Sequence, residues 1–262
     1  MIKIKSLLFV PARDKMLDKI KTMNADAYII DLEDSIEQEY KSQALENTKR
    51  FLEQNEASAP IFVRVNTDRA EEELSALDAC SNIGFMLPKF ESPEHYGTHN
   101  KAILRQHPII ALIETPMGIV NIQDILGCTW VDAVAFGAED YTAISNMKNT
   151  PEYLLYQKSR LLTYGKAYCK PVYDTPSFQL KDMEALKREI KMSAEMGFDG
   201  KLIISPKHIE AVDEGFACHD TQIMKKIIEE YESRGEAVAV IKGNVYEKMH
   251  IEHMKRIIRE SE

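Results

Sequence analysis

Short apolar runs alternate with longer amphipathic stretches along most of this chain. Stretches such as 38–53, 151–169 and 179–196 repeat apolar residues at helical spacing and predict helices. Eight runs have the length and composition of strands, and we predict them at 7–10, 27–31, 61–65, 84–89, 109–114, 133–137, 171–174 and 201–205. Successive strand and helix units predict an α/β fold with a closed TIM barrel, rather than an open doubly wound sheet.

The alternation stops after Phe216. A polar helix near 219–234, a short apolar run at 237–241, a turn at 242–244 and a basic helix at 248–260 are predicted to follow. We therefore predict a catalytic barrel domain over 1–216 and a helical arm over 217–262. Arms of this kind often reach a neighbouring subunit, so we expect this one to do so.

The overall composition argues against several classes of protein. A net charge of −9 leaves no broad basic face for a nucleic-acid partner. The amino-terminal apolar stretch runs directly into Pro11 and charged residues, so it is too short for a signal peptide or a membrane span. The cysteines form no paired motif for zinc or disulfides; they are Cys80, Cys128, Cys169 and Cys218. We expect a cytoplasmic protein with no membrane partner.

Two of the predicted strands end on carboxylates, at Glu114 and at Glu139 with Asp140. In a barrel the carboxyl ends of all strands share one face, so these acids are expected to meet there. Other polar residues at or near strand ends are Arg13, Asp31, Glu33, Asp34, Arg64, Lys89, Asp174 and Ser205. Because the candidate ligands are oxygens, Mg²⁺ fits best, with Mn²⁺ as an alternative and Zn²⁺ disfavoured.

Simpler interpretations of these residues remain open from the sequence. Asp31 or Asp34 alone is as well explained by a helix cap as by a binding site. Arg64 is also explained by a structural ion pair. Glu114 is harder to explain in this way, because Thr115 can cap the next helix and leave the glutamate free.

An ordered set of motifs resembles the citrate lyase beta subunit-like family, which includes malyl-CoA and citramalyl-CoA lyases within the HpcH/HpaI aldolase group. The resemblance covers residues 5–216. The motifs are Ser6-Leu-Leu-Phe-Val-Pro11, Asp31-Leu-Glu-Asp-Ser35, Arg64-Val-Asn66, Leu87-Pro-Lys89, Ile113-Glu-Thr115, Phe136-Gly-Ala-Glu-Asp140 and Gly197-Phe-Asp-Gly-Lys201.

The resemblance implies a TIM barrel in which Glu114 and Asp140 bind Mg²⁺. It implies that Arg64 holds a substrate oxygen. The acidic motif of Asp31, Glu33 and Asp34 would support metal-bound water, and Arg13 and Lys89 would line the mouth. The implied reaction is cleavage of a short 3-hydroxy-dicarboxylic acyl thioester, such as citryl-, malyl- or citramalyl-CoA, to an acyl thioester and a 2-oxo acid.

The arm departs from the family pattern. In several relatives an aspartate of the arm supplies a proton in a neighbouring subunit, within a segment that reads roughly Asp-Gly-x-Met-Val-Asp. Here the segment begins at Lys242 and ends at Glu247, which takes the place of the second aspartate. Ala12 and Ser205 replace the usual glycine and histidine of two barrel motifs. The resemblance implies a homo-oligomer, commonly a trimer or hexamer.

The leading hypothesis is therefore a Mg²⁺-dependent carbon–carbon lyase that acts on a thioester of CoA or of an acyl carrier protein. An aldolase that handles free 2-oxo acids is a second hypothesis. A diverged, non-catalytic lyase-like subunit is a third, and the altered arm segment from Lys242 to Glu247 keeps it open.

Overall fold

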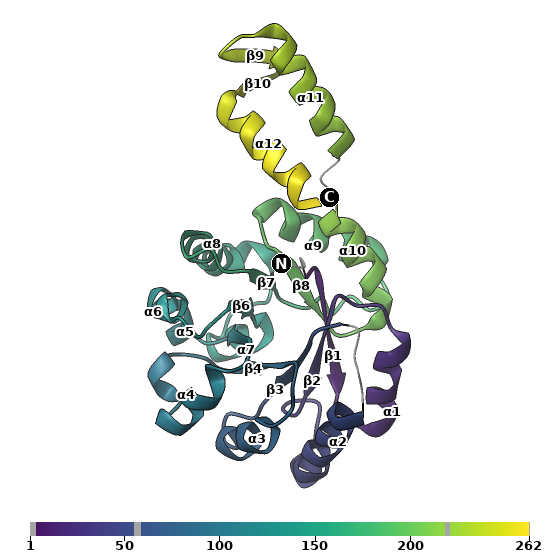
Figure 1. Ribbon diagram of the computed structural model, residues 1–262, viewed down its shortest axis with the longest axis vertical. Coiled ribbons are helices and arrows are strands. Elements are labelled where there is room, and N and C mark those ends of the chain that lie inside the picture. Colours follow the sequence, from purple (N-terminus) through teal and green to yellow (C-terminus); the bar gives the residue numbers. More distant parts are fainter. Residues whose placement is uncertain (1–3, 55–58, 218–220, 262) are drawn as a thin grey trace. The chain divides into compact units, whose positions relative to one another are not determined.

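The computed structural model describes residues 4–54, 59–217 and 221–261, and Cys218 lies outside them. The chain divides into two compact units, Met1–Phe216 and Ala217–Glu262. The first unit is a closed barrel of eight parallel strands in sequential order (Figure 1). The strands are β1 (Ser6–Pro11), β2 (Ala27–Asp31), β3 (Ile61–Arg64), β4 (Ile83–Leu87), β5 (Ile109–Ile113), β6 (Ala133–Phe136), β7 (Val172–Asp174) and β8 (Gly200–Ile203).

Helical segments connect the strands and form the outer layer of the barrel (Figure 1). The α-helices of this unit are α1 (Asp14–Leu17), α2 (Lys41–Gln54), α3 (Ala70–Leu77), α4 (Thr98–Leu104), α5 (Pro116–Val120), α6 (Ile122–Gly127), α7 (Ala138–Ile144), α8 (Pro151–Ala167), α9 (Met183–Met196) and α10 (Ile209–Ala217). Short 3-10 helices are η1 (Asp18–Thr22), η2 (Gln38–Tyr40), η3 (Pro93–His95) and η4 (Pro206–His208). Within the described ranges, no helix is long and apolar enough to cross a membrane.

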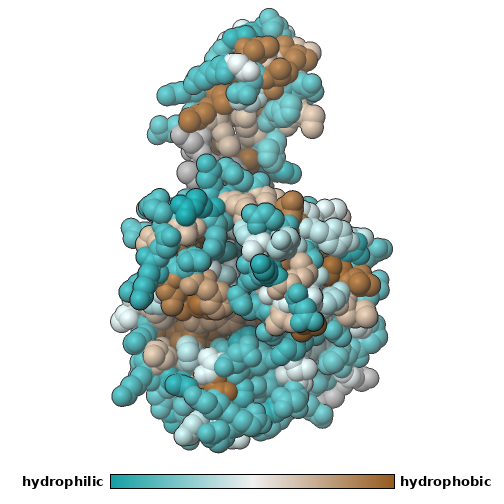
Figure 2. All heavy atoms as spheres, turned by 180° about the vertical axis from the view of Figure 1, so that it is seen from behind, coloured by the Kyte–Doolittle hydropathy of each residue, from teal (hydrophilic) through white to brown (hydrophobic). Residues whose placement is uncertain are grey.

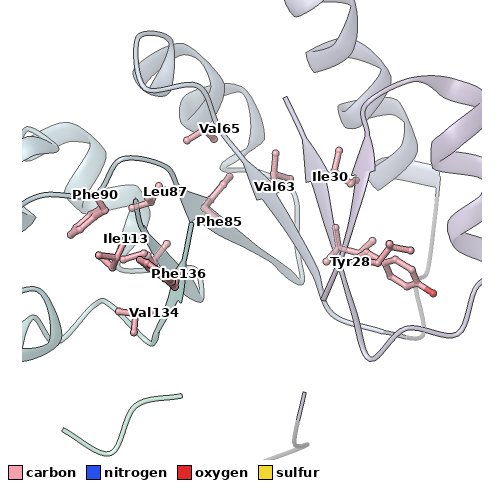
Figure 3. Close-up of a cluster of buried hydrophobic side chains, with 14 of the residues drawn as sticks. Tyr28, Ile30, Val63, Val65, Phe85, Leu87, Phe90, Ile113, Val134 and Phe136 are labelled. Atoms are coloured by element: carbon pink, nitrogen blue, oxygen red, sulfur yellow. The ribbon is translucent and has the colours of Figure 1, made fainter. Parts of the chain in front are cut away.

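Alternation along the strands builds two hydrophobic layers. One set of strand residues packs together inside the barrel, among them Ile29, Phe62, Leu112 and Leu202. The opposite set belongs to the core that the helices cover, and Figure 3 shows Tyr28, Ile30, Val63, Phe85, Leu87, Ile113, Val134 and Phe136 of this set. Val65 and Phe90, just beyond β3 and β4, belong to the same core. Since both faces of each strand are buried, the strands read as continuous apolar runs rather than as alternating ones.

The predicted barrel is confirmed, with differences confined to element ends. Several strands end one or two residues earlier than predicted, so Lys89, Glu114 and Gly137 lie just beyond β4, β5 and β6. The helix predicted at 179–196 begins at Met183, because the Asp182 side chain caps it by accepting a hydrogen bond from the Ala185 amide. These endpoint residues matter because the candidate site lies at this end of the barrel.

The second unit is a small helix and hairpin module. It contains α11 (Thr221–Arg234), α12 (Lys248–Ser261), and the antiparallel strands β9 (Val238–Ile241) and β10 (Asn244–Glu247). The sequence did not predict β10. Lys242 and Gly243 both have positive φ, at 49° and 82°, which is the conformation of a two-residue hairpin turn. Figure 2 shows hydrophobic side chains over this hairpin, where Val238, Val240 and Val245 are exposed.

Candidate active site

A ring of inward-facing residues closes the carboxyl end of the barrel. Alternate residues of a strand lie on the same face. Asp31 therefore faces inward like Ile29 on β2, and Arg64 faces inward like Phe62 on β3. Glu114 likewise continues the inward face of Leu112 on β5. On β6 this position is Gly137, and on β7 it is Thr175. The predicted acids and the arginine therefore meet because each extends the inward face of its strand.

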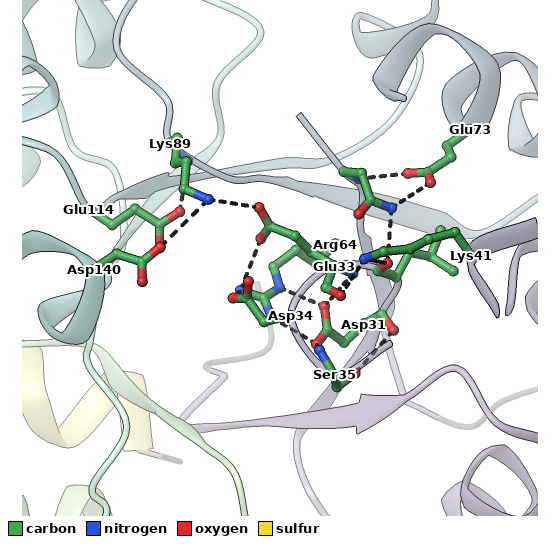
Figure 4. A network of polar contacts seen from close by, with 12 residues as sticks. Asp31, Glu33, Asp34, Ser35, Lys41, Arg64, Glu73, Lys89, Glu114 and Asp140 are labelled. Atoms are coloured by element: carbon green, nitrogen blue, oxygen red, sulfur yellow. Dashed lines mark hydrogen bonds and ion pairs between the residues drawn. The ribbon is translucent and has the colours of Figure 1, made fainter. Parts of the chain in front are cut away.

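Arg64 is at the centre of the acidic side of this ring (Figure 4). Its Nε and Nη2 atoms donate to the two oxygens of Asp31 at 2.7 and 2.8 Å, and Nη1 donates to Asp34 at 2.9 Å. Asp31 also accepts the backbone N–H groups of Glu33 and Ser35, which fixes the turn after β2. Asp31 is thus both a local turn residue and the anchor of a buried guanidinium.

Glu114, directly after β5, and Asp140, in the first turn of α7, lie side by side at the mouth (Figure 4). Thr115 caps α5 through its side chain, as the sequence suggested, and leaves Glu114 free to turn inward. Glu114 Oε1 accepts the Lys89 amide at 2.8 Å, and Lys89 Nζ lies 3.7 Å from Asp140 Oδ2. Lys89 Nζ also donates to Glu33 Oε1 at 3.2 Å. Three carboxylates and one ammonium group thus share a small volume.

The electrostatics of this cluster indicate a shortage of positive charge. Burial, with the nearby charges of Glu33 and Asp140, raises the pKa of Glu114 to about 8. Burial and Asp34 also raise the pKa of Glu33. Glu33 Oε2 is buried and accepts no hydrogen bond from any described residue, although Arg64 Nη1 lies 3.2 Å away. A bound cation with its water ligands would satisfy these oxygens.

The donor set fits Mg²⁺ in particular. Among the described residues no group of three or more His, Cys, Asp and Glu side chains is arranged as a complete metal cage. Mg²⁺ needs no such cage, since it commonly takes one or two carboxylates and fills its other positions with water and substrate. Glu114 and Asp140 are the residues placed to supply those two carboxylates.

The cavity above the ring has a volume of about 340 Å³ and two chemically different sides. The charged side comes from the ends of β2, β3, β5 and β6. The ends of β7, β8 and β1 form the opposite side, and its apolar lining residues are Pro176, Phe178, Leu202, Ile204, Phe9 and Pro11. We call this second side the apolar arc. Phe9 marks the border, because the Arg64 guanidinium stacks 4.9 Å from its ring centre.

The structure does not test the predicted roles of two other site residues, one in each unit. Arg13 lines a neighbouring hollow with Ala12 and Tyr40, where its guanidinium pairs with Glu37 at 2.8 Å. Glu247 ends β10 in the second unit, and its backbone N–H donates to the ring of His250. The predicted roles of Arg13 and Glu247 therefore stay predictions.

Asp174 and Ser205 are wrongly grouped with the mouth by their places at strand ends. Asp174 faces away from the barrel interior, opposite to Tyr173, and is fully buried between the strands and the helices. It pairs there with Lys158 at 2.9 Å and Lys201 at 3.3 Å. Ser205 instead caps η4 with its side chain. The alternation of strand residues could have revealed the error for Asp174.

Sequence reasoning also missed Tyr96. This side chain is buried against Phe90, and its hydroxyl has no hydrogen-bond partner among the described residues. Burial together with the charges of Glu33 and Glu114 raises the pKa of Tyr96 above its ordinary value. No motif singles out Tyr96, because it lies in an irregular segment after β4.

Comparison with known proteins agrees with this geometry. Residues 5–206 match the family model described as HpcH/HpaI aldolase/citrate lyase. The human mitochondrial citramalyl-CoA lyase is 30% identical over 81% of this chain and 71% of its own length. A (3S)-malyl-CoA thioesterase of Cereibacter sphaeroides is 26% identical over 98% of this chain and 94% of its own length.

Solved structures give the same relationship. RipC from Yersinia pestis superposes with a TM-score of 0.71 at 27% identity, over 84% of this chain and 98% of its own. A citrate lyase beta subunit from M. tuberculosis, complexed with oxaloacetate and magnesium, has a TM-score of 0.71 at 25% identity, over 82% of this chain and 97% of its own. The resemblance seen in the motifs is confirmed, and the chain belongs to the HpcH/HpaI aldolase/citrate lyase family.

Proposed function

We propose that this enzyme is a Mg²⁺-dependent carbon–carbon lyase that cleaves a short 3-hydroxy-dicarboxylic acyl thioester to an acyl thioester and a 2-oxo acid. The observation that carries the proposal is the meeting of Glu114, Asp140 and Glu33 at the mouth, with more carboxylate charge than the neighbouring cations balance. The lyases among its relatives, and the magnesium and oxaloacetate in one solved relative, support the same chemistry.

Glu114 and Asp140 would hold the metal, and Glu33 would accept hydrogen bonds from water bound beside them. The bound Mg²⁺ would act as a Lewis acid and template for the substrate's oxygens. The protein holds the ligand carboxylates in position, since Glu114 is fixed by the Lys89 amide and lies against Gly137. Such fixed geometry reduces the reorganisation that catalysis would otherwise need.

The cleaved bond joins the hydroxyl-bearing carbon to the carbon next to the thioester. The hydroxyl group loses its proton and becomes the carbonyl of the 2-oxo acid, while the electron pair of the broken bond passes to the thioester enolate. That enolate then takes up a proton to give the acyl thioester. Arg64, locked by Asp31 and Asp34, is placed to hold a substrate oxygen whose charge changes during this step.

Proton transfer is assigned to acids that meet solvent. Asp34 lines the cavity, is 60% exposed and contacts Arg64, so its carboxylate lies within reach of a substrate that Arg64 holds. Glu247 is the second candidate, by its place in the family's arm motif, and it would act in a neighbouring subunit of a homo-oligomer. Light scattering on the purified protein tests the oligomer, and Glu247→Gln tests the proton transfer by its effect on kcat.

The apolar arc favours one substituent on the hydroxyl-bearing carbon. A methyl group, as in a citramalyl thioester, would be buried against Ile204 and Phe178. A second carboxylate, as in a citryl thioester, would need a cation there. The cations that the structure describes at the mouth are already paired, Arg64 with Asp31 and Lys89 with Glu33. We therefore expect citramalyl-CoA to be cleaved faster than malyl-CoA and citryl-CoA.

The decisive assay measures release of the 2-oxo acid from citramalyl-, malyl- and citryl-CoA, with Mg²⁺ and with excess chelator. Glu114→Gln should abolish turnover, and Asp124→Asn, an exposed carboxylate on α6, serves as its control. Activity on free 2-oxo acids alone would favour the aldolase hypothesis. Tight Mg²⁺ binding without turnover of any thioester would favour the non-catalytic subunit.

A further inference from the structure

Lys89 contacts three of the mouth carboxylates at once (Figure 4). Its backbone N–H donates to Glu114 Oε1 at 2.8 Å. Its ammonium group lies 3.2 Å from Glu33 Oε1 and 3.7 Å from Asp140 Oδ2. The sequence placed Lys89 as a cation that lines the mouth, but it did not predict these contacts.

The backbone of Lys89 is held in an unusual conformation to make these contacts. Its φ is 47°, in the left-handed region that a residue with a side chain rarely adopts. Pro88 precedes it and β4 ends at Leu87, so the chain turns sharply where the strand stops. Backbone strain of this kind persists where the surroundings hold it and tends to cluster at functional sites.

The position of the ammonium group has a consequence for metal binding. A divalent cation held by Glu114 and Asp140 would have the Lys89 ammonium group as a like-charged neighbour, because that group already lies 3.7 Å from Asp140 Oδ2. Two positive charges so close together repel, and they compete for the same carboxylate oxygen. An anionic substrate that enters the site adds negative charge and reduces both the repulsion and the competition.

We propose that Lys89 is a resident counter-ion that weakens metal binding and makes it depend on the anionic substrate. This inference rests on the metal site of the proposed function. It assigns Lys89 a positioning role, with its amide orienting Glu114 and its ammonium group setting the affinity of the site. Metal and substrate then bind cooperatively, and by linkage each strengthens the binding of the other equally.

The test measures Mg²⁺ affinity by titration calorimetry on the full chain, first with Mg²⁺ alone and then with saturating oxaloacetate. Lys89→Met removes the ammonium group and keeps the backbone amide. We expect it to bind Mg²⁺ alone about tenfold more tightly than the wild type, as for loss of one nearby like charge. Lys89→Arg should stay close to the wild type. With oxaloacetate bound, the affinities of Lys89→Met and the wild type should converge.

Two further variants make the result interpretable. Lys166→Met removes an exposed lysine that pairs with Asp199, before β8 and so at the opposite end of the barrel, and it should leave Mg²⁺ affinity unchanged. Lys89→Gly accepts the positive φ without strain, so it replaces Lys89→Met if that protein unfolds. Its Mg²⁺ affinity should also rise.

Unchanged or weaker Mg²⁺ binding in folded Lys89→Met or Lys89→Gly would overturn the inference. It would also be overturned if oxaloacetate raised the Mg²⁺ affinity of the mutant and of the wild type by the same factor. A failure of the metal site itself looks different. In that case Glu114→Gln would bind Mg²⁺ as well as the wild type does, and the proposed function would fail along with the inference.

Discussion

Gly137 controls how far Glu114 reaches into the mouth. An alanine at this position would place its Cβ atom 2.6 Å from both Cβ and Oε2 of Glu114. Favourable carbon contacts begin at about 3.5 Å, so the glutamate must retreat by about 1 Å. The substitution causes no backbone strain, because Gly137 has a φ of −102°, which alanine adopts readily. The substitution therefore acts on Glu114 through steric contact alone.

A shift of this size is large for a metal ligand, whose distances hold to within about 0.2 Å. We expect Gly137→Ala to weaken Mg²⁺ binding by about tenfold to a hundredfold, the range seen when the support of a ligand is lost. Crowding should cost about 1–3 kcal/mol of unfolding free energy. The melting temperature should then fall by about 2–12 °C, which leaves the protein folded at the temperature of the binding assay.

Calorimetric titration with Mg²⁺ and a thermal melt of the same preparation measure both quantities. Gly97→Ala is the matched control, since an added Cβ there meets nothing within 4 Å. Wild-type Mg²⁺ affinity in folded Gly137→Ala would refute the reasoning, because it would mean that Glu114 can move without consequence or is not a ligand. A loss of affinity in Gly97→Ala as well would show that the effect is not local.

Two further predictions concern pH and specificity. Burial opposes ionisation of Asp174, but Lys201 and Lys158 outweigh it and lower the pKa of Asp174 to about 2. Its stabilising contribution of about 2 kcal/mol is therefore complete above pH 3.8 and is lost as the pH falls towards 2, which urea unfolding across this window measures. Ile204→Arg adds a cation to the apolar arc and should raise the ratio of kcat/KM for citryl-CoA over citramalyl-CoA; an unchanged ratio would contradict the assignment of the arc.

Alternation along the strands explains which parts of the structure were predictable. The eight apolar runs predicted the barrel, because only one face of its sheet fits the interior and the helices cover the other. The same logic places Asp31, Arg64 and Glu114 at the mouth, since each continues an inward face. A position at a strand end does not by itself show which face of the strand a side chain is on. For this reason Asp174 was wrongly assigned to the inner face.

Contacts made by irregular backbone were not predictable. The positive φ of Lys89 and the burial of Tyr96 depend on how the segment after β4 packs, and neither leaves a periodic pattern in the sequence. The arm shows the same limit. Its polar helix and its basic helix were predicted, but β10 was missed, because the pairing of this short segment with β9 depends on the turn at Lys242 and Gly243.

Residues on the inner face of the barrel strands are proposed to bind the metal, whereas Asp174 on the outer face stabilises the fold. Two matched substitutions should distinguish these roles. Asp174→Asn leaves Lys158 and Lys201 buried without their carboxylate, which should cost about 3–5 kcal/mol of unfolding free energy. Asp140→Asn changes a partly exposed residue and should cost little stability, yet it removes a proposed metal ligand. Urea unfolding and Mg²⁺ titration of both variants should therefore give opposite patterns. If Asp174→Asn lost Mg²⁺ binding while still folded, the ion pairs of Asp174 would be coupled to the carboxylates at the mouth. The metal site would then depend on residues on both faces of the barrel strands.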